Sequence, residues 1–290
     1  MCGQVPEIWT IRRVVRWSTD DFAGRGIESA RLDAELLVGH ALGIDRVKLY
    51  MDLERPLTPD ELARIRELVV RRRAREPIAY ILGRREFFGR NFRVSKAVLV
   101  PRPDTEVLIE RALESLPNEG TVRVLDLCTG SGCIAVTLAA ERSNVEVDAT
   151  DLSPDALEVA SANARALGVE SRVRLYEGDL FGALPEKREY GLIVCNPPYI
   201  PETERASLAP DVEAFEPALA LFGGRDGFEV LTRLAAEALT WLAKDASILV
   251  EVGAGQAPAV SELFAAAGLA EIRTHVDLGG HERVVEARST

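Results

Sequence analysis

The stretch YGLIVCNPPY, residues 190–199, joins a short apolar run to a rigid polar loop. Tyr190–Cys195 is apolar and rich in β-branched residues, a composition typical of a buried strand in a parallel sheet. The strand must end at Asn196, because two prolines follow that cannot donate to a hydrogen-bond ladder. In an open α/β sheet, ligands bind just outside the carboxyl ends of the strands. The sequence therefore predicts that Asn196–Tyr199 lies in a ligand site.

The residue types in this loop suit the recognition of a planar amino group. Asn196 offers a side-chain carbonyl and Pro197 a backbone carbonyl, so the two can accept both hydrogens of an –NH2 group. Tyr199 offers a flat face for stacking, although a buried core ring is an alternative role for it. We predict Asn196, Pro197 and Tyr199 as catalytic residues, with Pro198 completing the substrate-binding loop. NPPY resembles the active-site motif of methyltransferases that modify exocyclic amines of bases or the amide of glutamine.

From Val122 onward, strands and helices alternate, which indicates a parallel sheet covered by helices on both faces. The expected strands are 122–127, 145–150, 172–176, 190–195, 247–252, 270–276 and 282–288, and the expected helices lie near 132–141, 154–167, 227–243 and 256–267. Only residues 277–281 join the last two strands, too few for a parallel crossover, so the last strand must be antiparallel. This α/β pattern resembles the seven-stranded, Rossmann-like sheet of class I methyltransferases.

A glycine-containing loop, CTGSG, follows the first of these strands and precedes a helix. Its glycines permit a tight turn and a close backbone approach at a helix N-terminus. Asp151 ends the second strand, where a carboxylate commonly binds ribose hydroxyls, and Asp179 follows the third, placed to accept from an adenine amine. The predicted cofactor-binding residues are Cys128, Thr129, Gly130, Ser131, Gly132, Asp151, Asp179, Leu180 and Asn196.

The cofactor predicted from these residues is S-adenosylmethionine. Neither the dinucleotide pattern GxGxxG nor the Walker pattern GxxxxGK[ST] occurs, which disfavours NAD and ATP. The carboxylates Asp126, Asp151 and Asp179 have no obvious compensating cation nearby in sequence, and S-adenosylmethionine carries a sulfonium and an ammonium but no phosphate. Cys128 stands where the methyltransferase loop usually has its first glycine, which tightens the loop and could alter cofactor affinity. A small buried thiol is an alternative role for Cys128.

The first 76 residues are predicted as a separate helical domain. Residues 4–75 show helical spacing, with Ser29 as the cap of a helix that Gly43 closes, and with a capping box that starts at Thr58. Residues 77–106 change to alternating aromatic and β-branched positions, including Val98–Val100, which predicts a β-hairpin linker before a helix that starts at Asp104 or Thr105. Its rigid Pro-Arg-Pro loop could also cover the cofactor. Residues 107–290 then form the methyltransferase domain.

Composition restricts the function further. The net charge is −11, but residues 1–90 carry 17 Lys and Arg against 14 Asp and Glu, so the rest of the chain is strongly acidic and would repel a nucleic-acid backbone. No apolar run is long enough to span a membrane, and no signal peptide is recognisable. Four cysteines without a CxxC pair and only three histidines disfavour disulfides and a metal site, which fits the cytoplasm.

Segments along nearly the whole chain are similar to one family, the N5-glutamine methyltransferases of peptide chain release factors (the PrmC or HemK family). The matching segments are RLDAELLVGHALG (31–43), PIAYILGRREFFG (77–89), LVPRPDTEVLIERAL (99–113), DLCTGSGCIAV (126–136), NPPYIP (196–201), FEPALAL (215–221) and GHERVV (280–285). The resemblance implies that residues 1–76 dock a class 1 release factor. It also implies that the catalytic domain uses S-adenosylmethionine to methylate the glutamine of the factor's Gly-Gly-Gln loop.

Two other functions share part of this pattern. An adenine-N6 DNA methyltransferase also carries NPPY, but it needs a basic DNA-facing surface, and this sequence shows none. A protein that binds S-adenosylmethionine without catalysis would have no reason to keep both Asn196 and Tyr199. The family's activity therefore remains the expectation.

Overall fold

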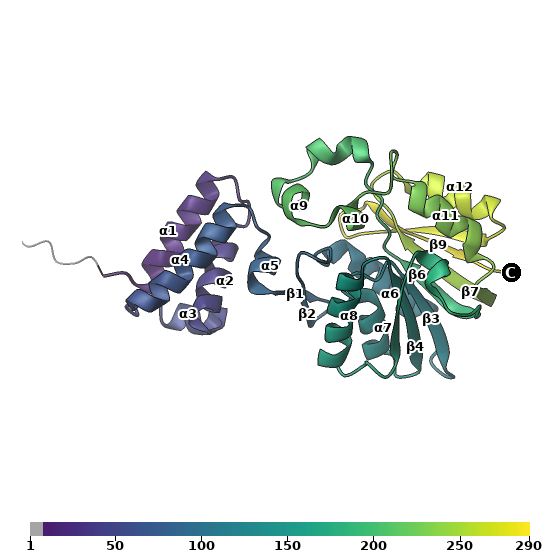
Figure 1. Cartoon of the computed structure of the whole chain (residues 1–290), viewed down its shortest axis with the longest axis horizontal. Helices are drawn as coiled ribbons and strands as arrows, with labels where there is room; N and C mark the ends of the chain where they lie inside the picture. Colours follow the sequence, from purple (N-terminus) through teal and green to yellow (C-terminus); the bar gives the residue numbers. More distant parts are fainter. Residues whose placement is uncertain (1–7) are drawn as a thin grey trace, which may run out of the picture. The chain divides into compact units, whose positions relative to one another are not determined.

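The computed structural model describes residues 8–290, which form two compact units (Figure 1). The first comprises the described residues up to Gly83 together with Pro210–Phe215, and the second comprises Arg84–Ala209 and Glu216–Thr290. The first unit therefore extends to Gly83 before the chain enters the second unit, whereas the sequence predicted this boundary at residue 76. The predicted helical start at residue 4 lies outside the described residues.

The first unit is a bundle of short helices around a small apolar core. Its helices are α1 (Ile11–Gly24), α2 (Ala30–Leu42), α3 (Arg46–Met51), α4 (Pro59–Arg73), α5 (Ile78–Leu82) and α9 (Pro210–Phe215). Ile11, Val14 and Phe22 of α1 are buried against α2 and α4, as their helical spacing predicts. Ile8 lies before α1 begins and is exposed, so it does not belong to this apolar face.

The predicted helix ends in this unit are largely confirmed. The Thr58 side chain accepts from the Glu61 N–H, and the Glu61 carboxylate accepts from the Thr58 N–H, which completes the capping box. Gly43 closes α2 in the left-handed conformation. Ser29 precedes α2, but its hydroxyl donates to the Asp33 carboxylate and caps no backbone N–H. Its predicted side-chain cap is not formed, because Ser29 has φ −83° and ψ 22° and not the extended backbone that directs an N-cap oxygen to the first N–H groups.

The second unit begins with a β-hairpin, β1 (Arg84–Phe87) and β2 (Arg90–Arg93). Phe87 and Phe92 meet edge to face at 6.0 Å and are buried in the core of this unit. Val98–Val100, expected in the hairpin, lies instead in a loop that leads to the 3₁₀ helix η1 (Pro103–Thr105) and then to α6 (Glu106–Ser115). Val98 and Val100 are nevertheless buried, so the apolar pattern reflects packing of a loop rather than of a strand.

The core of the second unit is a seven-stranded sheet with the order β5-β4-β3-β6-β7-β9-β8. Its strands are β3 (Val122–Leu127), β4 (Val145–Asp151), β5 (Val173–Glu177), β6 (Tyr190–Cys195), β7 (Leu242–Glu251), β8 (Ala270–Val276) and β9 (Glu282–Arg288). The last strand, β9, is antiparallel to both of its neighbours, as predicted. β7 begins five residues before the predicted start, because Leu242 pairs with Tyr190 ahead of an irregularity that contains the polar Lys244 and Asp245.

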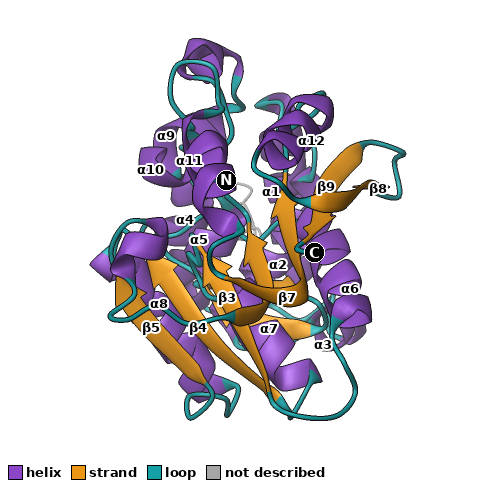
Figure 2. Ribbon diagram, turned by 90° about the vertical axis from the view of Figure 1, so that its right-hand side faces the viewer, coloured by secondary structure: helices purple, strands orange, loops and turns teal. Residues whose placement is uncertain are grey.

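Helices cover both faces of this sheet (Figure 2). Val124 of β3 packs on one face with α6 and α7 (Cys133–Glu141), whereas Leu125 packs on the other with α11 (Glu229–Ala238) and α12 (Ala257–Ala266). The remaining elements are α8 (Pro154–Ala166), α10 (Ala218–Leu221), η2 (Leu180–Ala183) and η3 (Glu202–Ser207). No helix within residues 8–290 is both long and apolar enough to cross a bilayer.

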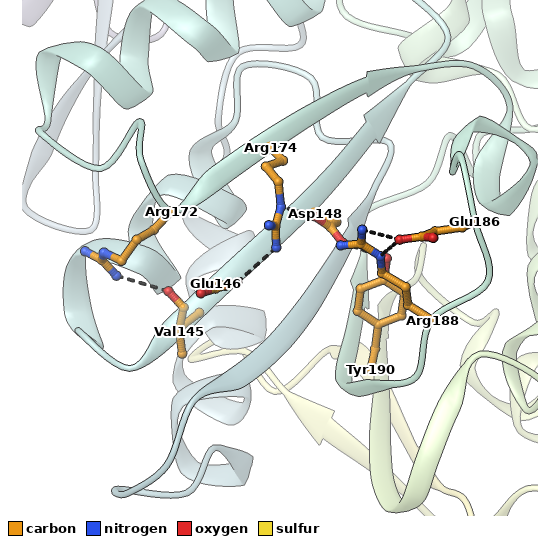
Figure 3. Close-up of polar contacts among 8 residues, drawn as sticks. All are labelled: Val145, Glu146, Asp148, Arg172, Arg174, Glu186, Arg188 and Tyr190. Carbon is orange, nitrogen blue, oxygen red and sulfur yellow. Dashed lines mark hydrogen bonds and ion pairs between the residues drawn. The ribbon is translucent and has the colours of Figure 1, made fainter.

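Asp148, in the middle of β4, is a buried carboxylate that ties three strands together (Figure 3). Arg174 of β5 donates to it at 2.8 Å, and the Tyr190 hydroxyl of β6 donates to it at 2.9 Å. The Arg188 guanidinium lies 3.8 Å away and is also paired with Glu186. These donors satisfy the buried charge and fix the start of β6, the strand that leads to Asn196.

Candidate active site

The two predicted loops meet at the point where the order of the sheet reverses direction. β3 pairs with β4 on one side and with β6 on the other, and Leu127 is the register partner of Cys195. Cys128 and Asn196, the next residue on each strand, therefore emerge at the same edge of the sheet. This position is the topological switch point at which open α/β sheets bind ligands. A pocket of about 190 Å³ lies there.

Most of the residues predicted from sequence line this pocket: Cys128, Thr129, Gly130, Ser131, Asp151, Asp179, Leu180, Asn196 and Pro198. Gly132, Pro197 and Tyr199 do not line it. Gly132 instead serves the backbone, since it begins α7 at φ +75° and a Cβ there would lie 3.0 Å from the Cβ of Ala160.

Asp151 holds the loop after β3 in place. Its Oδ2 accepts from the Gly130 N–H at 2.8 Å and its Oδ1 accepts from the Ser153 N–H at 2.9 Å. Burial raises the pKa of this carboxyl group, and these backbone hydrogen bonds oppose the rise. Each oxygen retains a second lone pair, so the carboxylate can still accept from a ligand hydroxyl.

The surroundings of two other carboxylates, Asp179 and Asp126, differ from those predicted from the sequence. Asp179 forms an ion pair with Arg233 of α11, so its charge is compensated. Asp126 is fully buried beneath the loop, where it accepts from the Thr129 hydroxyl at 2.6 Å and the Ala135 N–H at 3.1 Å. The prediction of three uncompensated acids is therefore wrong, because the partner of Asp179 comes from a helix 54 residues later.

Two pocket residues other than glycine adopt the left-handed backbone conformation, Cys128 at φ +60° and Leu180 at φ +46°. Such conformations cost about 1–2 kcal/mol for a residue with a Cβ. Cys128 thus adopts a backbone conformation that glycine would adopt without strain. This explains why methyltransferase loops usually have a glycine at this position. Strain of this kind is stored at functional sites more often than elsewhere.

The NPPY loop is held by hydrogen bonds from outside it. The Asn196 Nδ2 donates to the Thr105 hydroxyl at 3.2 Å, and the Tyr199 hydroxyl donates to Glu251 at 3.3 Å. Gln256 Nε2 donates to the Tyr199 carbonyl at 2.9 Å. Asn196 is thereby fixed by its amide nitrogen, which leaves its Oδ1 as the acceptor for a ligand.

Two glycines make room for the backbone of this loop. A Cβ on Gly223 would lie 2.4 Å from the Pro198 carbonyl oxygen, and a Cβ on Gly227 would lie 2.3 Å from that of Tyr199. Both distances are too short for any side chain. The path of the loop therefore depends on glycine at positions that follow it by more than twenty residues.

Comparison with known proteins identifies the family. Residues 13–83 match the model of the PrmC N-terminal domain, and residues 104–211 match that of the methyltransferase small domain. A release factor glutamine methyltransferase from Geobacter sulfurreducens is 45% identical over 98% of both chains. One from Cereibacter sphaeroides is 47% identical over 94% of this chain and 96% of its own. The chain belongs to the release factor glutamine methyltransferase family.

The fold agrees with this membership. A methyltransferase from Pyrococcus furiosus superimposes with a TM-score of 0.53 over 70% of this chain and 90% of its own, at 18% identity. At that identity the likeness concerns the class I methyltransferase fold alone. The predicted seven-stranded sheet with an antiparallel last strand is confirmed.

Sequence reasoning missed several residues of this methyltransferase's pocket. Besides the predicted loops, it is lined by residues of the segment 97–105, which supplies Ala97, Val98, Leu99, Pro101, Arg102 and Thr105, and by Pro217, Leu219, Ala220, Phe222, Val230 and Arg233. The Pro-Arg-Pro sequence indicated a rigid cover for a cofactor, but nothing local showed what anchors it. Arg102 pairs with the buried Glu216 at 2.6 Å, and that acid also accepts from the Val100 N–H.

Replacing Asp151 by alanine is expected to weaken the binding of S-adenosylmethionine by roughly 1.5–3 kcal/mol, the range for a hydrogen bond to a charged group. The change would remove a ligand acceptor and also the bond that holds Gly130. Isothermal titration calorimetry measures the affinity, and Asp155→Ala, which removes a carboxylate in the first turn of α8, is the control. Unchanged affinity in Asp151→Ala would exclude this residue from the cofactor site.

Stability of the enzyme is expected to fall as the pH rises from 5 to 8. Burial raises the pKa of Asp126 from 3.8 and of Glu251 from 4.5, in both cases to about 7. Between these values the folded chain binds more protons than the unfolded chain, so deprotonation favours unfolding. Asp277, with a pKa lowered to about 2, titrates below this range. Urea unfolding at several pH values measures the slope, which Asp126→Asn should reduce; a slope of opposite sign would contradict the assignment.

Proposed function

We propose that this enzyme transfers the methyl group of S-adenosylmethionine to the side-chain amide nitrogen (N5) of the glutamine in the Gly-Gly-Gln motif of class 1 release factors. One observation carries the proposal. Asn196 lines the pocket beside the loop after β3 and donates its Nδ2 to Thr105. Its Oδ1 is thus the atom left to accept from a substrate, which requires a substrate that donates, as an amide –NH2 does.

The pocket fits S-adenosylmethionine by the chemistry of its lining. Asp151 would accept from the ribose hydroxyls, Asp179 would accept from the adenine amine, and apolar side chains such as Val98 and Phe222 would cover the ring. When bound, the cofactor supplies an electrophilic methyl group on a positively charged sulfur. The loop Cys128–Gly132 would hold the methionine end, with Gly130 and Ser131 as its pocket-lining backbone.

The chain's own contribution to catalysis is to orient a poor nucleophile. The lone pair of an amide nitrogen is delocalised into the carbonyl, so it attacks only when it is turned out of conjugation. The Oδ1 of Asn196, which lines the pocket, would accept one N–H hydrogen and direct the lone pair toward the methyl group. The role of the Pro197 carbonyl as the second acceptor rests on the sequence motif, because Pro197 is buried and does not line the pocket. Such positioning can supply most of the rate without a strong general base, and the surplus proton leaves after transfer.

Tyr199 has two candidate roles. Its side chain is partly buried, its hydroxyl is bonded to Glu251, and its ring lies against Gly253. These contacts fit a ring that supports the loop from within. Stacking on the substrate amide, as predicted from the sequence, uses the remaining exposed face and is kept as part of the proposal.

The proposal assigns separate tasks to the parts of the chain. Residues 1–76 would dock the release factor, residues 77–106 would form the hairpin linker, and residues 107–290 would bind the cofactor and catalyse transfer. Since release factors act on cytoplasmic ribosomes, the enzyme would work in the cytoplasm. It would need neither a metal ion nor direct binding to nucleic acid.

Mass spectrometry of a release factor incubated with the enzyme and S-adenosylmethionine tests the proposal. We expect one added methyl group, on the glutamine of the Gly-Gly-Gln loop, and no addition to a factor in which that glutamine is replaced by alanine. Duplex DNA in a parallel reaction tests the alternative substrate. Methylated adenine with an unmodified release factor would overturn the proposal.

A further inference from the structure

The turn between β7 and α12, residues 252–256, is joined to the NPPY loop by one buried side chain, that of Gln256. This residue directly precedes α12, and it is only 9% exposed. Its Oε1 accepts from the Gly253 N–H at 2.9 Å, and its Nε2 donates to the Tyr199 carbonyl at 2.9 Å. A single amide group therefore connects the turn to the last residue of the NPPY loop, 57 positions earlier in the sequence.

The orientation of the Gln256 amide follows from its two partners. An N–H group requires an acceptor and a carbonyl requires a donor, so the amide oxygen faces Gly253 and the amide nitrogen faces Tyr199. The reverse orientation would place two donors against each other and two acceptors against each other. Gly227 lies against the same contact, since a Cβ there would be 2.3 Å from the Tyr199 carbonyl oxygen and 3.0 Å from Gln256 Nε2. The hydrogen bond to Tyr199 is thus buried and fixed in direction.

The NPPY loop depends on donors from outside because it has few of its own. Pro197 and Pro198 carry no N–H group, and their rings fix φ, so the conformational freedom of the loop lies mainly in its ψ angles. Those angles are restricted when both ends of the loop are held. Asn196 is held through its side-chain amide, and Tyr199 is held through its backbone carbonyl by Gln256.

We propose that Gln256 is a positioning residue for methyl transfer, which sets the path of the NPPY loop and so the place of Asn196 in the pocket. The inference rests on the proposed function, because it assumes that Asn196 accepts from the substrate amide. Gln256 does not line the pocket, so it should affect transfer without touching the cofactor. Ile200, directly after the loop, pairs with residues 221–223 through backbone hydrogen bonds, which remain when Gln256 is changed.

Gln256→Glu tests the inference in the full-length enzyme. The ionised carboxylate keeps an acceptor for the Gly253 N–H but has no hydrogen to donate to the Tyr199 carbonyl. We expect kcat on intact release factor to fall about tenfold, the upper range for loss of one hydrogen bond, with KM for the factor changed by less than about twofold. Calorimetry measures the cofactor Kd, which should stay at the wild-type value, and the fraction of sites that bind. The kcat is then expressed per binding-competent site.

Two further variants show which hydrogen bond matters. Gln256→Met has the same length but removes both bonds, so its kcat should be no higher than that of Gln256→Glu. If only the bond to Gly253 mattered, Gln256→Glu would keep the wild-type kcat. Asn144→Asp is the matched control, since Asn144 also donates from its amide to backbone carbonyls, in a loop outside the pocket. Its kcat should equal that of the wild type.

A double-mutant cycle separates positioning from mere support of the fold. If Gln256 acts through Asn196, then Gln256→Glu should cause no further loss of kcat in an Asn196→Ala background. Wild-type kcat in Gln256→Glu, full additivity with Asn196→Ala, or loss of cofactor binding in both Gln256 variants would overturn the inference and leave the amide clamp intact. Wild-type kcat in Asn196→Ala alone would overturn the clamp itself.

Discussion

Asn196→Ala is expected to lower kcat by about 100-fold or more, as for the loss of a preorganised polar contact in a transition state. In the proposed mechanism, the substitution removes the side-chain acceptor for the substrate nitrogen, whereas the residues that line the pocket from the loop after β3 and from β4 remain. Cofactor affinity should therefore change by less than about fivefold. Single-turnover methylation of intact release factor measures the first quantity, and calorimetry measures the second.

A matched control uses another asparagine whose amide nitrogen is also hydrogen-bonded. Asn144 donates from Nδ2 to the carbonyls of Pro117 and Gly120, in a loop outside the pocket. Asn144→Ala should keep the wild-type kcat, although it removes as many atoms. Equal turnover in Asn196→Ala and the wild-type enzyme would show that the clamp does not operate.

A short Gly-Gly-Gln peptide is expected to be methylated with a kcat/KM at least about 100-fold below that of intact release factor. A stable protein interface needs about 800 Å² from each partner, and the tip of one loop offers the pocket a small part of that area. The rest of the contact must lie elsewhere, and we assign it to the helices of the first unit. Steady-state kinetics on both substrates measure the difference, which should reside in KM.

Removal of residues 1–83 tests that assignment. The shortened chain should bind S-adenosylmethionine and methylate the peptide at the full-length rate, but it should lose its preference for the intact factor. Pro210–Phe215, which belongs to the first unit, remains in place, so cofactor affinity serves as the check on folding. A loss of equal size on both substrates would mean that the helices only stabilise the catalytic part.

The features that sequence predicted well are those whose causes are local. The capping box at Thr58 needs only residues within one turn, and the end of β6 follows from Pro197 and Pro198 themselves. Strand alternation likewise placed the loop after β3 at the pocket. Because these features depend only on neighbouring residues, they can be predicted from the sequence without knowledge of the fold.

The features that sequence did not predict depend on partners brought together by the fold. Thr105 bonds to a residue 91 positions away, and Glu251 bonds to one 52 positions away. Arg233 neutralises Asp179 from a helix that a linear reading cannot place beside it. A carboxylate with no cation nearby in the sequence can therefore still be paired in the folded protein.

The close contact of Gly223 and Gly227 with the NPPY backbone bears on how mutations in this enzyme should be interpreted. Neither glycine has a side chain that could touch a substrate, yet a single added methyl group at either would push against the Pro198 or Tyr199 carbonyl. Substitutions at these two positions should therefore displace the NPPY loop and impair turnover in a folded protein. A motif search restricted to the four letters of NPPY would classify such a gene as intact.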